Sequence, residues 1–321
     1  MVSPSDRPRT RLLTVLLRRA LAALVTLWAA VTLAFFALRI TGGDPTHSLL
    51  AQGLASPEQV AALRRELGLD APLAVQYVRY LADLIRGDLG ESLYTSRHVI
   101  TVIGEQLPSS LELALSAFAI SLILGLSLGL ASGWYPRRVF GRAADALSAL
   151  ATGLPVAVVG LAAILAAAYF SRMFLPALVL TRAGGLVLPS LTLGFAASGA
   201  LARAIQAGLL ETSAAPYLVA ARARGIAHGT RLMWHALRPV LPLAVSLSAL
   251  QAAFLLSGTV VTETVFSRPG LGRLLVSAIL DGDYPVVQGL VILGAAVYTV
   301  TYAAAEIFAL LLDPRLRDVE R

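Results

Sequence analysis

Six runs of about 20 residues contain no aspartate, glutamate, lysine or arginine, and they restrict the fold of this chain more than any other feature. A helix of about 20 apolar residues crosses the roughly 30 Å hydrocarbon core of a bilayer. Because lipid offers the backbone no hydrogen-bonding partner, and because the alternating pattern of a barrel strand is absent, each run is expected to be helical. The sequence therefore predicts an all-α membrane protein with six transmembrane helices, at residues 20–38, 113–135, 146–171, 183–202, 239–262 and 284–305.

The composition agrees with membrane insertion. Hydrophobic residues make up 57% of the chain, charged residues make up 14%, and the mean hydropathy is +0.75, which is far from the averages of soluble domains. The first apolar run could be read as a cleaved signal peptide. It is long for the apolar part of a signal, however, and no clear small-residue cleavage site follows it. We therefore expect it to be retained as a membrane helix.

The positions of the arginine residues predict the orientation of the chain. Sixteen of them lie in the two terminal segments and in the segments that follow the second and fourth runs, whereas the other side holds ten. Five of those ten lie in one long segment, where acidic residues outnumber them. Short segments rich in arginine stay in the cytoplasm, so both termini are expected to be cytoplasmic. The net charge of +7 is then mostly a signal of topology, and no nucleic-acid partner is expected.

The chain contains neither lysine nor cysteine, and both absences restrict its chemistry. All 26 basic residues are arginine, so a phosphate-binding loop that ends in Gly-Lys-Ser/Thr cannot be present. If ATP drives this protein, another chain must hydrolyse it. The chain also has no cysteine, which excludes thiolate metal sites, disulfides and thiol catalysis. No cofactor and no metal ion are expected.

Residues 42–107 form a polar insertion between the first and second runs. Ser56-Pro57-Glu58-Gln59 is a capping box with proline at the first helical position, and Gly68 is placed to end that helix. A second helix is expected from about Pro72 to Arg86, ended by Gly87. The insertion is read either as a docking or sealing platform at the outer mouth of a pore or as a cap that orders the loops.

Residues 203–238 form a polar segment that carries five arginines between two apolar runs. One short helix is expected from Pro216 to Arg224, because proline suits a first helical turn and Gly225 suits a left-handed stop. A second is expected from about Thr230, as the N-cap, to Leu237, before Arg238-Pro239. Such a pair lying along a membrane surface could be a lever between a membrane bundle and a soluble motor. The alternative is an ordinary basic loop that holds the topology.

The second run carries small residues at a spacing of four, which places them on one helix face: Ala117, Ser121, Gly125, Gly129 and Gly133. Such a stripe lets helix backbones approach closely in lipid. The letters of residues 125–129 also match the Gly-x-Ser-x-Gly pattern of serine hydrolases. Ser127 would need a histidine base, yet all four histidines lie in segments outside the runs. We therefore do not expect an intramembrane protease.

Other features of the runs bear on transport. Gly153 and Pro155 predict a bend in the third run, as is common where a pathway opens and closes. The acidic residues nearest to the runs, Glu112, Asp145 and Glu306, lie at their ends. The proton or sodium relay of an ion-coupled transporter is therefore missing, and so are the charged rings of a channel filter.

Four stretches carry a family resemblance. They are TGGDP at 41–45; ELGLD at 66–70 with GDLG at 87–90; AARARG at 220–225; and TETVFSRPGLG at 262–272 with DYPVVQ at 283–288. In this order and at this spacing, the chain resembles the inner-membrane permease subunits of binding-protein-dependent ABC importers of the dipeptide, oligopeptide and nickel type. The resemblance runs from about residue 12 to residue 317. It implies a type I importer permease fold that occupies residues 1–321 as one transmembrane domain.

The resemblance also implies roles for particular residues. The 203–238 segment would be the coupling-helix pair that inserts into a cleft of the ATPase subunit, and the family pattern has a glutamate where this chain has Val219. The implied coupling residues are Pro216, Ala220, Ala221, Arg222, Ala223, Arg224 and Gly225. The implied extracytoplasmic motif residues are Gly43, Asp44, Pro45, Glu263, Phe266, Pro269, Gly270, Gly272, Asp283, Tyr284 and Pro285.

The implied assembly contains a second homologous permease subunit, two ATP-binding cassette subunits and an extracytoplasmic substrate-binding protein, in a bacterial or archaeal inner membrane. This chain would form half of the translocation path. The resemblance favours small peptides as the substrate, and nickel or another small solute is the alternative within the family. The alternatives from other classes are a non-transporting membrane scaffold and the intramembrane protease.

Overall fold

The computed structural model describes the chain except for residues 1–6, 42–55, 67, 172–183, 258 and 313–321. The described residues are mostly helical and contain no strand beyond one isolated bridge between Glu91 and His98. In the first half of the chain, the helices are α1 (Arg7–Thr41), α3 (Pro57–Glu66), α4 (Leu73–Ile85), α5 (Val99–Trp134), α6 (Val139–Gly153) and α7 (Val156–Ser171). In the second half they are α9 (Gly184–Ser213), α10 (Pro216–Ala223), α11 (His228–Thr230), the π-helix η1 (Arg231–Ala236), α12 (Leu241–Ser257), α13 (Val260–Val265), α14 (Leu271–Asp281) and α15 (Tyr284–Leu312).

The chain divides into two compact units. Unit 1 comprises residues 1–105 and 274–299, and unit 2 comprises residues 106–273 and 300–321. Long helices α5 and α15 therefore contribute to both units. The following paragraphs treat the packing within each unit.

Four helical segments are long and apolar enough to cross a membrane: Leu21–Ile40, Val99–Trp134, Gly185–Ser213 and Tyr284–Thr301. The pair α6 and α7 would count as a fifth span if the bent pair crosses as one. The remaining expected run lies in α12, which has 17 residues and includes the shorter apolar helix Leu241–Ala252. The all-helical membrane fold is confirmed, with four or five spans found among the described residues.

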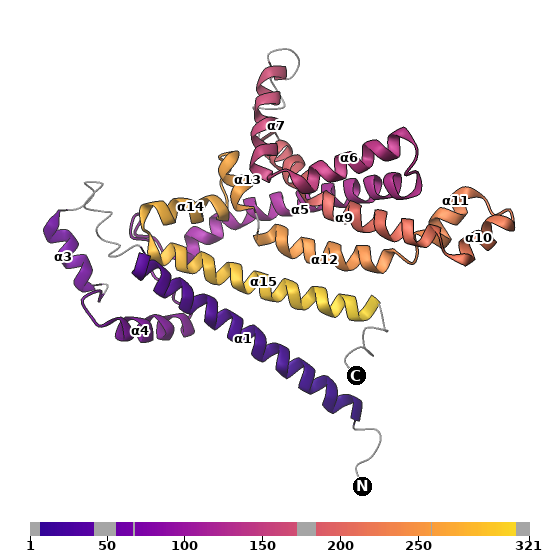
Figure 1. The fold of residues 1–321 in the computed structure, drawn as a ribbon. Coiled ribbons are helices and arrows are strands. Elements are labelled where there is room, and N and C mark those ends of the chain that lie inside the picture. The colour runs from indigo at the N-terminus through magenta and orange to yellow at the C-terminus, as the bar shows by residue number, and fades with distance from the viewer. Residues whose placement is uncertain (1–6, 42–55, 67, 172–183, 258, 313–321) are drawn as a thin grey trace, which may run out of the picture. The chain divides into compact units, whose positions relative to one another are not determined.

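In unit 1, α4 packs against the C-terminal part of α1 (Figure 1). Phe35 is fully buried, and its ring lies 5.2 Å from that of Tyr77 and 5.3 Å from that of Tyr80. Two polar contacts flank these rings. The hydroxyls of Thr32 and Tyr77 lie 2.7 Å apart, and Arg39 Nε donates to Gln76 Oε1 at 3.0 Å. Because the apolar stack and both hydrogen bonds join the same two helices, α4 is fixed to α1.

The helices of the insertion begin and end as the local sequence predicts. The Ser56 N–H donates to Gln59 Oε1 at 2.7 Å, and the Gln59 N–H donates to Ser56 Oγ at 3.3 Å, which confirms the capping box. Gly68 and Gly87 follow α3 and α4 with φ of +65° and +81°, a left-handed conformation that glycine adopts without strain.

In unit 2, the small-residue stripe of α5 lies against α9. A Cβ placed on Gly125 would come within 2.8 Å of the Leu201 side chain. A Cβ on Gly129 would come within 2.8 Å of the carbonyl oxygen of Ala202, and one on Gly133 within 2.9 Å of Leu209. Ser121, on the same stripe, is fully buried. Since real Cβ atoms essentially never approach so closely, the two backbones pack at a distance that these glycines permit.

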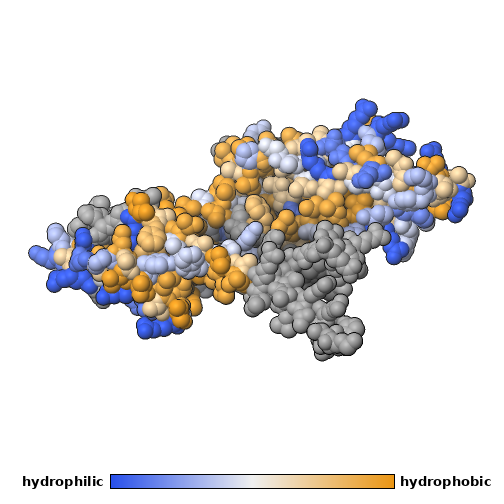
Figure 2. Space-filling view, turned by 60° about the horizontal axis from the view of Figure 1, so that its bottom comes forward, coloured by the Kyte–Doolittle hydropathy of each residue, from blue (hydrophilic) through white to orange (hydrophobic). Residues whose placement is uncertain are grey.

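The helix pair α6 and α7 bends by 112° at the break between Gly153 and Val156. Pro155 lies in that break, as the sequence predicts. The α6 side of the bend is held to α9, because Gln206 Nε2 donates to Asp145 Oδ1 at 2.9 Å and Gly199 lies against the Thr152 backbone. Apolar residues cover much of the face of unit 2 seen in Figure 2, and hydrophilic residues gather at the end that carries α10 and α11.

Candidate functional site

The turn after α10 is a glycine-ended Schellman motif. Pro216 is the first residue of α10, and Gly225 follows the helix with φ of +72°. The Gly225 N–H donates to the Arg222 carbonyl at 3.0 Å, and the Ile226 N–H donates to the Ala221 carbonyl at 3.2 Å. These two bonds satisfy carbonyls at the helix end that would otherwise lack a donor. The chain therefore reverses at Gly225 in a fixed geometry.

The second helical piece begins earlier than the sequence predicts. Ala227, with ψ of 143°, precedes α11, so the helix starts at His228. Thr230 already has helical dihedrals of −64° and −41°, and its side chain makes no capping hydrogen bond. The prediction of Thr230 as the N-cap is therefore wrong. From Arg231 to Ala236 the helix widens into a π-helix, for which the local residues gave no signal.

Buried apolar side chains anchor the α10–η1 segment, residues 216–236, to unit 2. Leu218 of α10 and Ala236 of η1 are buried in one cluster with Leu209 of α9 and Val240. Trp134, at the end of α5, packs against the same cluster. The cluster thus joins α5, α9, α10, η1 and α12.

Aromatic residues hold the start of the second piece. Trp134 Nε1 donates to the His228 ring, 2.9 Å from Nε2, and the Tyr135 ring stacks on His228 at 5.5 Å between centroids. The Tyr217 hydroxyl donates to the His235 carbonyl at 3.3 Å, which links α10 to η1. The two helical pieces are thus tied to α5 and to each other.

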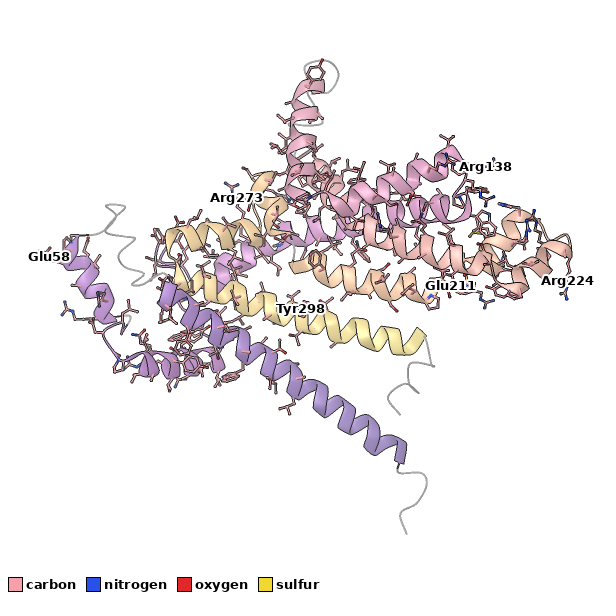
Figure 3. All side chains as sticks on the ribbon, in the orientation of Figure 1. Glu58, Arg138, Glu211, Arg224, Arg273 and Tyr298 are labelled. Atoms are coloured by element: carbon pink, nitrogen blue, oxygen red, sulfur yellow. The ribbon has the colours of Figure 1, made fainter. Side chains whose placement is uncertain are left out.

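The outer face of this segment is open. Of the seven residues expected to couple, only Ala221 is buried, whereas the other six are exposed: Pro216, Ala220, Arg222, Ala223, Arg224 and Gly225. Large apolar side chains are exposed beside them, namely Tyr217 at 48%, Val219 at 60%, Met233 at 55% and Trp234 at 66%. Figure 3 places the labelled Arg138, Glu211 and Arg224 at this same end of unit 2. A groove of about 390 Å³ lies along the segment, lined partly by Trp134, Arg222, His228 and Arg231.

A second constellation joins α5, α13 and α14 through Glu263. This residue of α13 is fully buried. Ser110 Oγ donates to Glu263 Oε1 at 2.6 Å and accepts the Leu271 N–H at 2.8 Å. Glu263 Oε2 accepts the N–H groups of Gly272 at 2.7 Å and Arg273 at 3.2 Å. Two side chains from other helices thus satisfy the first three N–H groups of α14, the role that a local N-cap usually has.

The residues between α13 and α14 fit closely around this carboxyl group. A Cβ on Gly270 would overlap the Glu263 carboxyl group, and one on Gly272 would overlap the backbone of Val260. Phe266 lies over Gly160 of α7, and the Pro269 carbonyl accepts from Ser109 Oγ. The sequence motif from Glu263 to Gly272 is therefore one packed junction.

Arg268 and Ser267 complete the junction. The guanidinium of Arg268 donates to the Gly185 carbonyl at 2.9 Å and pairs with Glu112 at 3.1 Å. Ser267 has φ of +50° and ends α13 in the same Schellman pattern as Gly225 ends α10. The Ser267 N–H donates to the Thr264 carbonyl, and the Arg268 N–H donates to the Glu263 carbonyl. The junction thus connects α5, α9, α13 and α14.

In unit 1, Asp283 holds the residue 91–98 loop to the turn before α15. Its Oδ2 accepts from Ser92 Oγ at 2.5 Å, and its Oδ1 accepts the Leu93 N–H at 3.2 Å. Burial raises the pKa of the Asp283 carboxyl, and hydrogen bonds from Ser92, Leu93 and Val286 only partly oppose that rise. Tyr284 is buried beside it, and Pro285 lies near Gly90.

The structure bears differently on the remaining candidates. Gly43, Asp44 and Pro45 lie outside the described residues. Ser127 donates to the Leu124 carbonyl of its own helix at 3.1 Å. His228 contacts Trp134. Within the described residues, no group of three or more histidine, aspartate or glutamate side chains could hold a metal ion.

Unit 2 also contains an apolar cavity of about 600 Å³. Residues of α7, α9, α12 and α13 line it, and Gln251 is its most polar contributor. Gln251 Nε2 donates to the Ala197 carbonyl, so this amide already has a partner. Among the residues that the structure describes, no charged side chain lines this cavity.

The sequence interpretation missed several residues of these constellations. Ser92 and Ser110 meet their carboxyl partners across more than 150 residues, and no local pattern marks them. The sequence gives His228 no signal beyond its place in the polar segment 203–238. A signal did exist for Trp134 and Tyr135, because aromatic residues at the end of an apolar run are typical of a membrane interface.

Comparison with known proteins identifies similar chains over almost the whole length. Residues 121–318 match the family described as binding-protein-dependent transport system inner membrane component, and residues 12–114 match the N-terminal part of such membrane components. The chain is 31% identical to a probable peptide ABC transporter permease of Sinorhizobium fredii and 34% identical to a putative peptide transport system permease of Brucella abortus, each over 94% of this chain and 98% of the relative. It is 30% identical to the glutathione transport system permease of Salmonella paratyphi A, over 95% of this chain and 99% of that protein.

Proposed function

Because the chain belongs to the family of inner membrane components of binding-protein-dependent transport systems, and is therefore an ABC importer permease, we propose that it forms half of a translocation path for small peptides. Importers of this family work with ATPase subunits and a substrate-binding protein. In the proposed assembly there are two ATPases, one extracytoplasmic binding protein and a second, homologous permease. Both termini of this chain lie in the cytoplasm.

The α10–η1 segment is the proposed contact with the ATPase. The observation that carries this assignment is its exposed face, where Arg222, Arg224 and Gly225 lie beside the exposed Val219 and Trp234. Aromatic and arginine side chains are enriched at protein interfaces. Val219 stands where the family pattern has a glutamate, so the contact at that position is apolar rather than ionic.

The anchoring of the segment supports a mechanical role. ATP binding draws the two ATPases together, and their clefts move the α10–η1 segments as rigid bodies. The buried cluster around Leu218 and Leu209 passes this movement to α5, α9 and α12. The permease then rocks from an inward-open to an outward-open state, and hydrolysis resets it.

The chain itself has no part in nucleotide chemistry in this proposal. It has no lysine, and so it cannot form the usual phosphate-binding loop. The energy for transport enters through the ATPase subunits alone. In unit 2, the Glu263 junction holds the start of α14 while the α10–η1 segment is moved.

Peptides are the proposed substrate class because the curated relatives are described as peptide and glutathione permeases, and glutathione is itself a small modified peptide. Selection among peptides then falls to the binding protein.

Uptake by the complete complex tests the substrate class. Proteoliposomes that hold the permease pair, the ATPases and the binding protein are expected to accumulate radiolabelled dipeptides and tripeptides, with ATP hydrolysis stimulated by the same compounds. Unlabelled glutathione added as a competitor would refine the class further. Accumulation of Ni²⁺ without any response to peptides would contradict the peptide assignment and favour the nickel alternative of the same family.

A further inference from the structure

Helix α4 lies beside the membrane-spanning part of α1 rather than beyond its end. Its Tyr77 meets Thr32, which is eight residues before the end of the span Leu21–Ile40, a rise of about 12 Å along the helix. Its Tyr80 stacks on Phe35, which is five residues before that end. Since these contacts fix α4 at the level of residues 32–39 of α1, α4 occupies the same depth as the outermost turns of a transmembrane helix.

An exposed apolar face runs along α4. Val75, Val78, Ala82 and Ile85 are spaced at i, i+3, i+7 and i+10, which places them on one side of the helix. Val75 is 40% exposed, Val78 is 64% exposed and Ile85 is 87% exposed. None of the aromatic contacts with α1 uses this side, because those contacts are made by Tyr77 and Tyr80.

A polar face borders the apolar one. Arg79, Asp83 and Arg86 are spaced at i, i+4 and i+7, and all three are exposed. Arg86 NH1 lies 3.6 Å from Asp83 Oδ1, an exposed pair of the kind that forms in water. Helix α4 therefore has three sides: one packed on α1, one apolar and open, and one charged and open. This is the pattern of a helix that lies in a membrane interface.

We propose that α4 is embedded in the leaflet that surrounds the C-terminal end of α1, with Val75, Val78 and Ile85 in contact with lipid and Arg79, Asp83 and Arg86 in the headgroup and water layer. Lipid is the occupant because α1 also exposes large apolar side chains at this depth, where Leu33 is 69% exposed and Ile40 is 75% exposed. A soluble binding protein could reach this face only by entering the hydrocarbon layer.

A consequence follows for the insertion as a whole. A helix held in lipid on one side and bonded to α1 on another cannot rotate freely when the binding protein docks. The embedded helix α4 therefore acts as a fixed base for the residues that follow it, through the turn at Gly87.

Nitroxide accessibility tests this proposal, and the absence of native cysteine makes each label unique within this chain. Val78→Cys and Ile85→Cys are labelled in the complete complex, reconstituted in phosphatidylethanolamine and phosphatidylglycerol vesicles. Asp83→Cys, on the charged side of the same helix, is the matched control, and Leu33→Cys on α1 is the lipid reference. Peptide-stimulated ATP hydrolysis confirms that each labelled complex is folded.

The expected result is a shift in the ratio of relaxation by oxygen to relaxation by a water-soluble nickel chelate. The ratio at positions 78 and 85 should approach that at position 33, whereas position 83 should favour the chelate. If positions 78 and 85 were as accessible to the chelate as position 83, the helix would lie in water and the proposal would be overturned. Protection of positions 78 and 85 from both reagents only when the binding protein is present would also overturn it, because a protein would then cover the face.

Discussion

The variant Gly225→Val is expected to lose most of its transport while the complex still assembles. Gly225 has φ of +72°, and nothing lies within 4 Å of a Cβ placed on it. The penalty therefore comes from the backbone and not from a clash. Holding a β-branched residue in this conformation costs about 1–3 kcal/mol. That cost corresponds to about a 5- to 150-fold loss of the native turn relative to other conformations, and peptide uptake in proteoliposomes should fall accordingly.

Gly225→Asn provides the matched control for this variant. Asparagine tolerates the left-handed conformation far better than valine, and the same open space receives its side chain. It should therefore keep most of the uptake and most of the coupling between peptide and ATP hydrolysis. An equal loss of uptake in both variants would mean that any side chain at position 225 disturbs a surface contact, and that the left-handed turn is not the cause. Full transport by Gly225→Val would remove the turn from the coupling mechanism altogether.

Glu263→Leu is expected to destabilise unit 2 strongly. The change leaves the N–H groups of Gly272 and Arg273 and the hydroxyl of Ser110 without their acceptor in a buried site. Each unsatisfied buried group costs about 1–3 kcal/mol, so the total is expected to be about 3 kcal/mol or more. The measurements are the thermal unfolding of the complex in lipid nanodiscs and the amide hydrogen exchange of residues 271–273, which should become faster.

Two further variants separate the hydrogen bonds from the charge of the region. Glu263→Gln keeps one acceptor oxygen, so it should lose less stability than Glu263→Leu. Glu112→Gln removes the carboxyl group that pairs with Arg268, but that carboxyl group is 61% exposed, and Arg268 keeps the Gly185 carbonyl as a partner. Its effect should be within about 1 kcal/mol. Comparable losses for Glu112→Gln and Glu263→Leu would contradict the role assigned to the buried junction.

Features that depend on neighbouring residues could be predicted from the sequence. The ends of α3, α4 and α10 fall where Gly68, Gly87 and Gly225 predict them. A left-handed residue ends a helix through backbone hydrogen bonds to carbonyls in the last turn of that helix, so the signal is local. The capping box at Ser56 and the break at Pro155 are local in the same sense. The apolar runs predicted helices because a backbone surrounded by lipid must form all its hydrogen bonds within its own segment.

Features that depend on distant residues could not be predicted. Glu263 belongs to a recognisable motif, but its partner Ser110 is 153 residues away and resembles any other serine of a membrane helix. Thr230 has the chemistry of an N-cap, yet Ala227 takes that position because the chain is already extended there after the Gly225 turn. The role of the exposed apolar face of α4 also depends on distant residues, because it follows from the depth at which Tyr77 and Tyr80 meet α1.

The central claim is that the α10–η1 segment is the contact through which ATPase subunits move this permease. A photoactivatable benzophenone attached to Val219→Cys, in a chain that has no other cysteine, tests it in the complete complex. Val219 is 60% exposed on the segment, and Ile123, 68% exposed on α5, serves as the control position. The account predicts an ATPase adduct from position 219 and none from position 123. Adducts to lipid or to other proteins at position 219, without any ATPase adduct, would contradict it.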